Sequence, residues 1–179
     1  VRHPEWFHFR KNLNRYANKH GGVVDQPLLH PDLKHIPSRW DCEAIFSLVK
    51  ENLSAKSGSL LDVNANFGFF CHKFEDEGFD CLALEDSEKH SYFLERLRRA
   101  GNKKFRILTG SLRDEYGIDN FHYKVVLALY FNECPTKMKC GQLIHIEFLT
   151  KLRTDELFFL YRQYDQPSTI TAGRDSKPS

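Results

Sequence analysis

The sequence of 179 residues has no Cys-x-x-Cys pair among its cysteines. Its five cysteines leave one over after any pairing, so neither a disulfide framework nor a zinc knuckle is indicated. The pairs His72 with Glu75 and His145 with Glu147 lack a third and a fourth ligand, and we expect no bound metal. We expect reduced, mostly buried thiols at Cys42, Cys71, Cys81, Cys134 and Cys140.

Long apolar runs are also missing. No stretch reaches the roughly 18 uninterrupted apolar residues that a membrane span requires, and the first residues have no signal-peptide core. We therefore expect no membrane partner and a cytoplasmic location. A net charge of +2, with 28% charged and 41% hydrophobic residues, excludes wholesale disorder and fibrous repeats. The length suits one domain.

The charge is unevenly distributed, because residues 1–38 are basic, aromatic and rich in histidine. We interpret them as an N-terminal arm, residues 39–165 as the main domain, and residues 166–179, rich in Ser, Thr, Pro and Gly, as a flexible tail. The Lys, Arg and aromatic side chains of the arm fit nucleic acid, but a solvated face is favoured.

Apolar side chains in the arm recur at helical spacing. Trp6, Phe9, Leu13 and Tyr16 are three or four residues apart, which predicts a helix from about residue 5 to residue 19. Such a helix either packs on the domain, which is the commoner outcome, or covers a substrate as a lid.

After the arm, strand and helix patterns alternate. Ser38 is the expected cap of the first helix of the domain. Strands are expected at 60–63, 81–84, 105–108, 124–130 and 157–161. Helices are expected at 38–53, 67–74, 87–100 and 142–152. This order predicts an α/β, Rossmann-like fold: a mainly parallel sheet with helices on both faces and the most apolar strand, 124–130, in a central place.

The chemistry is concentrated where the first strand ends. In an open α/β sheet, ligands bind beyond the carboxyl ends of the strands, near the switch point of the connections. There Asp62 is followed by the turn Asn64-Ala65-Asn66 and by Gly68, which leads into a helix. Asn readily adopts a positive φ, so Asn64 and Asn66 can occupy turn positions that usually require Gly. Gly68 permits a close approach of the backbone.

A second acid supports a ligand at this edge. Glu85 ends the second predicted strand, where a carboxylate can accept hydrogen bonds from both hydroxyls of a ribose. Strand, tight turn, helix, strand and acid together indicate a nucleoside-binding unit. An isolated strand-end carboxylate is as often merely solvated, so this interpretation depends on the whole unit.

Residues 62–70 resemble the first motif of class I S-adenosylmethionine-dependent methyltransferases, in the variant Asp-hydrophobic-Gly-Ala-Asn-x-Gly-Phe/Tyr-Phe. The similarity continues through 78–85, 109–112 and 123–131. It implies a cofactor whose methionine part lies near Asp62, Ala65 and Gly68, whose ribose is held by Glu85, and whose adenine lies near residues 111 and 112. The candidate cofactor-binding residues are Asp62, Asn64, Ala65, Asn66, Gly68, Glu85, Asp86, Ser111, Leu112 and Leu129.

The sequence departs from this family at three points. Asn64 replaces the first Gly, Ser111 stands where an Asp often contacts the adenine amine, and about five of the family's seven strands are present. Either the chain is part of a longer protein or its last strands are absent. A degenerate fold kept as a binding or interaction module is therefore the alternative. A NAD-type oxidoreductase is disfavoured, because the G-x-G-x-x-G spacing is absent.

The acceptor side is expected at the end of the fourth strand. Residues 129–132 do not form the Asn/Asp-Pro-Pro-Tyr/Phe motif of enzymes that methylate amino groups of nucleobases or glutamine. We expect transfer to an oxygen or nitrogen of a small-molecule or saccharide-like acceptor. Glu133 and His122 are the candidate catalytic bases for a hydroxyl acceptor, although a helix-capping Glu and a surface His are the commoner roles. No oligomeric state is indicated.

Overall fold

The computed structural model describes residues 4–110, 117–129, 149 and 151–160. Its elements are α1 (Pro4–Lys19), η1 (Pro31–Leu33), α2 (Cys42–Asn52), β1 (Gly58–Val63), α3 (Phe69–Asp76), β2 (Phe79–Glu85), α4 (Glu88–Ala100), β3 (Arg106–Thr109), η2 (Ile118–Asn120), β4 (His122–Leu129) and β5 (Arg153–Leu160). Each strand predicted from the sequence is present, with bounds shifted by a few residues.

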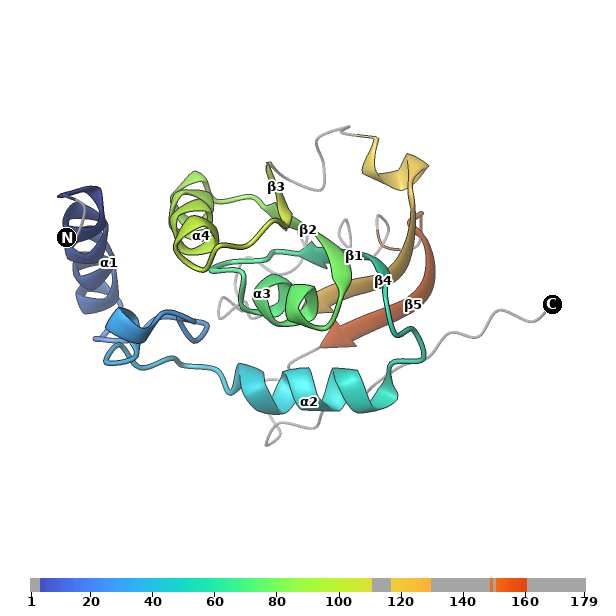
Figure 1. The fold of residues 1–179 in the computed structure, drawn as a ribbon, viewed down its shortest axis with the longest axis horizontal. Helices are drawn as coiled ribbons and strands as arrows, with labels where there is room; N and C mark the ends of the chain where they lie inside the picture. Colours follow the sequence, from blue (N-terminus) through green and yellow to red (C-terminus); the bar gives the residue numbers. More distant parts are fainter. Residues whose placement is uncertain (1–3, 111–116, 130–148, 150, 161–179) are drawn as a thin grey trace, which may run out of the picture.

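The strands form one parallel sheet in the order β3-β2-β1-β4-β5 (Figure 1). Leu61 in the central strand pairs with Leu82 of β2 on one side and with Val126 of β4 on the other. The connections after β1 run first toward β3 and later cross to β4, so the switch point lies at β1. The predicted Rossmann-like fold is confirmed, and β4 lies inside the sheet as expected.

Successive side chains of the strands point to opposite faces, and both faces are buried. Leu60 and Val125 belong to a core with side chains from α2, α3 and α4, which cover the same face (Figure 1). Leu61 and Val126 pack on the other face with Ile118 of η2 and with residues 149 and 152. Most of the helix expected at 142–152, and the whole tail at 166–179, lie outside the described residues.

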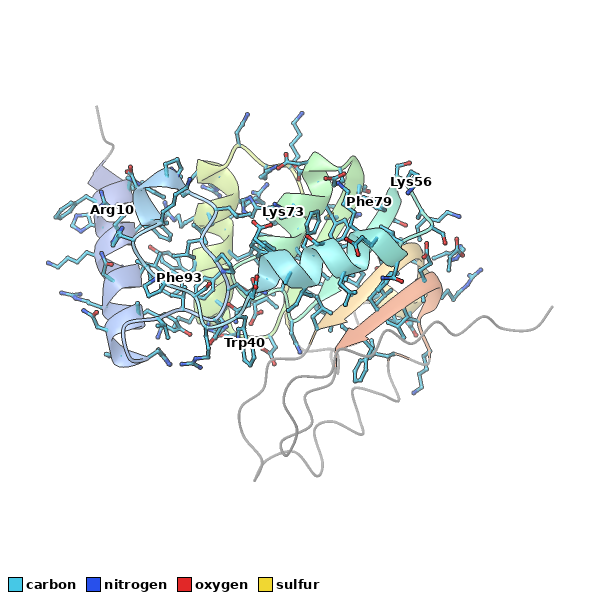
Figure 2. All side chains as sticks on the ribbon, turned by 90° about the horizontal axis from the view of Figure 1, so that it is seen from below. Arg10, Trp40, Lys56, Lys73, Phe79 and Phe93 are labelled. Atoms are coloured by element: carbon cyan, nitrogen blue, oxygen red, sulfur yellow. The ribbon has the colours of Figure 1, made fainter. Side chains whose placement is uncertain are left out.

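The predicted arm helix is confirmed as α1, and it packs against α4. Phe9 and Leu13 are 1% and 0% exposed, in a second core that includes Phe93 and Phe67. Figure 2 shows Phe93 between α1 and the rest of the fold, and its ring centroid lies 6.1 Å from that of Phe9. Phe7 is 65% exposed, whereas Phe9 is too buried to stack on a base. None of the helices among the described residues is long and apolar enough to cross a membrane.

The cap of α2 differs from the prediction. The Asp41 carboxylate accepts a hydrogen bond from the Ala44 N–H at 3.0 Å, while Ser38 donates to the Trp40 carbonyl. Ser38 cannot be the cap because its backbone pairs with Val24 in a short parallel bridge, and the helix begins only at Cys42. The prediction of Ser38 as the cap is therefore wrong.

Candidate functional site

The turn after β1 has the backbone conformation expected from its sequence. Asn64 and Asn66 adopt φ values of 58° and 55°, and Gly68 adopts 79°. The Ala65 N–H donates to the Leu84 carbonyl at 3.0 Å, which fastens the turn to β2. Positive φ at both asparagines confirms that they occupy positions usually taken by Gly.

Gly68 is required by packing as well as by its backbone conformation. A Cβ at this position would lie 2.2 Å from Cδ1 of Leu94, a residue of α4 that is 0% exposed. Gly68 is also the N-cap of α3, which begins at Phe69 rather than at the predicted Phe67. The close approach that the sequence indicates is therefore made to α4.

Glu85 and the turn are in direct contact. Oε2 of Glu85 accepts a hydrogen bond from the Asn66 N–H at 2.6 Å, and Oε1 accepts one from the Ser87 N–H at 2.9 Å. Nδ1 of His90 lies 3.4 Å from Oε1, and the glutamate is 3% exposed. Burial raises the pKa of Glu85, but hydrogen bonds from His90, Ser87 and Asn66 more than offset it, so the net pKa is lowered. The carboxylate is therefore ionised and largely satisfied within the protein.

The N-terminal segment covers this acid. The hydroxyl of Tyr16, in α1, lies 3.0 Å from Nε2 of His90. The Tyr16 side chain is 6% exposed, and burial together with the charge of Asp25 raises its pKa to about 12. The ring of Phe67 packs against both Tyr16 and His90. A partly buried series of polar contacts thus joins α1 to the end of β2.

Two further residues of this segment reach the turn. Asn66 donates from its side-chain amide to the Asp25 carboxylate at 3.5 Å, and the Phe69 N–H donates to Oε1 of Gln26 at 3.2 Å. Gln26 is 1% exposed and satisfies one of the free N–H groups at the start of α3. Sequence reasoning missed Asp25 and Gln26, which lie in no periodic pattern. His90 was detectable, because it lies in the first turn of the predicted helix 87–100, which follows directly after Glu85 in the sequence.

Asp62 lies beneath the turn. It is 1% exposed on the face covered by α3, where the Cys71 thiol donates to its Oδ2 at 3.6 Å. Burial raises the pKa of Asp62 to about 7. The expected buried, unpaired thiols are found at Cys42, Cys71 and Cys81, while Cys134 and Cys140 lie outside the described residues.

The remaining candidate residues lie either at the carboxyl-end edge of the sheet or outside the described residues. Leu129 is 4% exposed and ends β4, at the same edge of the sheet as Glu85, and Asp86 is exposed beside that glutamate. Within the described ranges, no three His, Cys, Asp or Glu side chains are grouped to hold a metal. The candidates outside the described residues are Ser111, Leu112 and Glu133.

The position of His122 corrects the hypothesis that it is a catalytic base. It is the first residue of β4, and Leu129 is the last. At about 3.3 Å per residue, these two lie roughly 20 Å apart, at opposite edges of the sheet. His122 is half-exposed, and its Nε2 contacts Asp155 at 2.7 Å. It has the surface role that was the commoner expectation.

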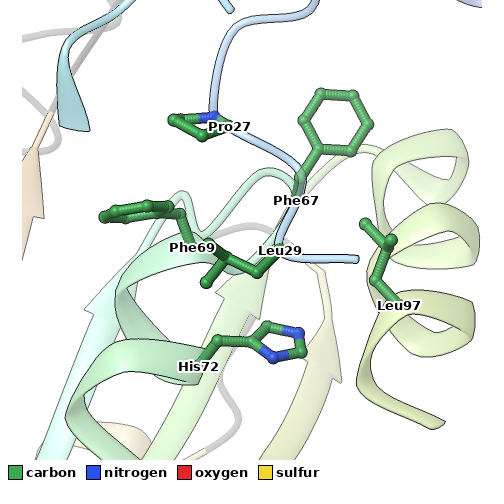
Figure 3. A pocket seen from close by; sticks show the side chains of 6 residues that line it. All are labelled: Pro27, Leu29, Phe67, Phe69, His72 and Leu97. Atoms are coloured by element: carbon green, nitrogen blue, oxygen red, sulfur yellow. The ribbon is translucent and has the colours of Figure 1, made fainter. Parts of the chain in front are cut away.

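A small hollow lies beside the turn, on the side of α4 (Figure 3). Nε2 of His72 has no hydrogen-bond partner among the described residues, and burial lowers the pKa of this imidazole to about 4. The hollow contains no carboxylate, so it does not match a ribose. Its lining residues are Pro27, Leu29, Phe67, Phe69, His72 and Leu97.

Comparison with known proteins gives a match only in structure. No family model matches the sequence, and no curated protein matches it. The bifunctional kinase-methyltransferase WbdD superposes with a TM-score of 0.64 and 14% identity, over 87% of this chain and 36% of that chain. A protein of Methanococcus maripaludis, assigned as an S-adenosylmethionine-dependent methyltransferase, gives a TM-score of 0.50 and 13% identity over 64% of this chain and 54% of that one.

The chain has the class I methyltransferase fold. This methyltransferase-fold chain spans little more than a third of the length of WbdD. At such low identities the likeness shows the shared fold alone. Whether the chain binds a cofactor has to be argued from its own turn and acid.

Proposed function

We propose that the chain binds S-adenosylmethionine at the carboxyl ends of β1 and β2 and transfers its methyl group to an oxygen or nitrogen of a small-molecule or saccharide-like acceptor. One observation carries the proposal: Asn64 and Asn66 both have a positive φ. The turn therefore forms although the first Gly of the related motif is missing, and Glu85 is held directly against it.

The residues present fit such a cofactor in part. The backbone of 64–68 would border its methionine part, and Glu85 would accept from the ribose hydroxyls. Ser111 and Leu112 would contact the adenine. Leu129 would face the sulfonium, which supplies an electrophilic methyl group when bound. For a hydroxyl acceptor, Glu133 would take up the proton. The chain's own contribution is mainly to position the two reactants.

The burial of Glu85 supports a second candidate function. With 3% of its surface exposed, the acid is covered by Tyr16 and His90. A fold that keeps this arrangement permanently would serve as a non-catalytic binding or interaction module. The two functions differ in whether the acid becomes accessible to a ligand.

Calorimetric titration with millimolar S-adenosylmethionine tests the cofactor. We expect wild-type protein to bind and Glu85→Gln to weaken binding by roughly tenfold or more, since a hydrogen bond to a charged group contributes about 1.5–3 kcal/mol. Glu88→Gln, an exposed acid in the first turn of α4, is the control and should bind as wild type does. Absence of heat from the wild type would refute the cofactor assignment, as would equal affinity of folded Glu85→Gln.

Catalysis is tested by release of S-adenosylhomocysteine with a panel of hydroxyl and amino acceptors. Release with one acceptor class, lost in Glu133→Gln, would support transfer. Cofactor binding without release for any acceptor would support the binding module. A parallel titration with NADH should show no binding, and binding of NADH in place of S-adenosylmethionine would favour an oxidoreductase.

A further inference from the structure

Tyr16, His90 and Glu85 form a series of polar contacts that runs from α1 to the end of β2. Nδ1 of His90 faces an ionised carboxylate oxygen at 3.4 Å, so in the neutral imidazole this nitrogen carries the proton. Nε2 is then an acceptor, and Tyr16 donates its hydroxyl proton to it at 3.0 Å. In this tautomer the tyrosine hydroxyl holds His90 in its orientation toward Glu85.

The number of acceptor positions on Glu85 decides whether it can bind a ribose while it stays in contact with His90. A carboxylate offers about four lone-pair positions. Among the described residues, three are used by Asn66, Ser87 and His90. A ribose diol donates two hydrogen bonds and so needs two positions. The contact with His90 is the longest of the three, and it comes from a side chain rather than the backbone, so it is the one that can be released.

We propose that Tyr16 and His90 form a gate on Glu85, which a ligand with a vicinal diol must open by displacing His90 from Oε1. This inference rests on the proposed function, because it takes the ligand of Glu85 to be a nucleoside. Tyr16 and His90 are then positioning residues that lower the apparent affinity for the cofactor and couple its binding to the packing of α1.

The surroundings of the gate explain why its opening reaches α1. The ring of Tyr16 packs on Phe67 and Phe93, and Nζ of Lys89 lies 4.3 Å from its ring centroid. Tyr16 is thus held on several sides, and its hydroxyl is its polar contact with His90, beside an edge-to-face contact of the two rings at 5.7 Å. When His90 leaves Glu85, this contact is strained or lost, and α1 loses one of its attachments to α4.

The decisive variant is Tyr16→Phe, which keeps the ring and removes the hydroxyl. A buried hydrogen bond contributes about 0.5–1.5 kcal/mol, so we expect this variant to bind S-adenosylhomocysteine roughly two- to tenfold more tightly than wild type in calorimetry. Tyr92→Phe is the matched control, because Tyr92 is a partly exposed tyrosine of α4 that takes no part in the contacts among Tyr16, His90 and Glu85. It should bind with wild-type affinity.

A second measurement uses the wild-type protein alone. Hydrogen exchange of the α1 amides should become faster when S-adenosylhomocysteine binds, while the amides of residues 64–68 become slower. An affinity of Tyr16→Phe equal to or below that of wild type would overturn the gate. Slower hydrogen exchange of the α1 amides on binding would also overturn it. This measurement uses wild-type protein, so it remains decisive even if Tyr16→Phe does not fold.

The outcomes separate the gate from the proposed function. If wild type binds, Glu85→Gln binds weakly and Tyr16→Phe binds as wild type does, the gate is wrong and the cofactor site remains. If neither wild type nor Tyr16→Phe binds at millimolar ligand, the proposed function fails and the gate with it.

Discussion

The Glu85 carboxylate holds the Asn66 N–H at 2.6 Å, which locks the acid at the end of β2 to the turn at the end of β1. These two strands are neighbours in a parallel sheet, so their carboxyl ends meet at one edge. The Asn66 N–H belongs to a turn in which Asn64 and Asn66 both have a positive φ. The geometry of the candidate site therefore depends on backbone conformation as much as on side-chain chemistry.

Asn64→Gly should leave the free energy of unfolding and the cofactor affinity nearly unchanged, because Gly adopts φ near 58° without strain. Asn64→Val should lower the free energy of unfolding by about 1–2 kcal/mol or more, since a β-branched side chain is strained in the left-handed region. Urea unfolding and calorimetry measure the two effects. Equal stability of the Gly and Val variants would contradict the role given to Asn64.

Gly68→Ala should destabilise the protein more than Gly78→Ala does. Both glycines have a positive φ, which costs an alanine about 1–2 kcal/mol. Only at Gly68 does the new Cβ meet a buried side chain, Leu94, which adds about 1–3 kcal/mol of overpacking, whereas nothing lies within 4 Å of a Cβ at Gly78. Urea midpoints compare the two variants, and equal losses would argue against tight packing of the turn on α4.

Asp62→Asn should change how stability depends on pH. The pKa of Asp62 is raised from 3.8 to about 7 in the folded protein, so the neutral acid is favoured there. Its contribution is fully present below about pH 4 and is lost as the pH rises to about 7, at on the order of 1.4 kcal/mol per unit. The stability of Asp62→Asn relative to wild type should therefore rise over this window.

The test compares the free energies of unfolding of Asp62→Asn and wild type at each pH, because other groups titrate in the same range. Burial lowers the pKa of His72 to about 4, so its contribution is lost as the pH falls, which opposes that of Asp62 in wild type. Urea unfolding from pH 4 to pH 8 gives the difference. Asp80→Asn, at an exposed carboxyl, should follow wild type. A difference for Asp62→Asn that does not vary with pH would mean that this acid is not buried.

Phe9→Ala should lower the free energy of unfolding by about 3–5 kcal/mol, because Phe9 is fully buried between α1 and α4. Phe7→Ala, at an exposed aromatic of the same helix, should change it by less than about 0.5 kcal/mol. Urea unfolding distinguishes the two. A small effect of Phe9→Ala would mean that residues 1–38 act as a separate arm, the division first expected from their composition.

Much of the fold follows from the sequence, because hydrophobic periodicity and helix caps act over a few residues. The strand positions, the start of α4 near residue 87 and the positive φ of Asn64 and Asn66 are of this kind. The prediction failed where a contact with a residue distant in the sequence intervenes, as at Ser38, which pairs with Val24 while Asp41 caps α2.

The sequence by itself determined that a strand, a left-handed turn and a strand-end acid follow one another, since each depends on the backbone preferences of neighbouring residues. Only the tertiary structure decided that Glu85 is engaged by Asn66 and His90 and covered by Tyr16, and that His122 lies at the far edge. Tyr16 and His90 are 74 residues apart in the chain. They meet because the apolar face of α1 packs on α4, and no local pattern encodes which polar groups such packing brings together.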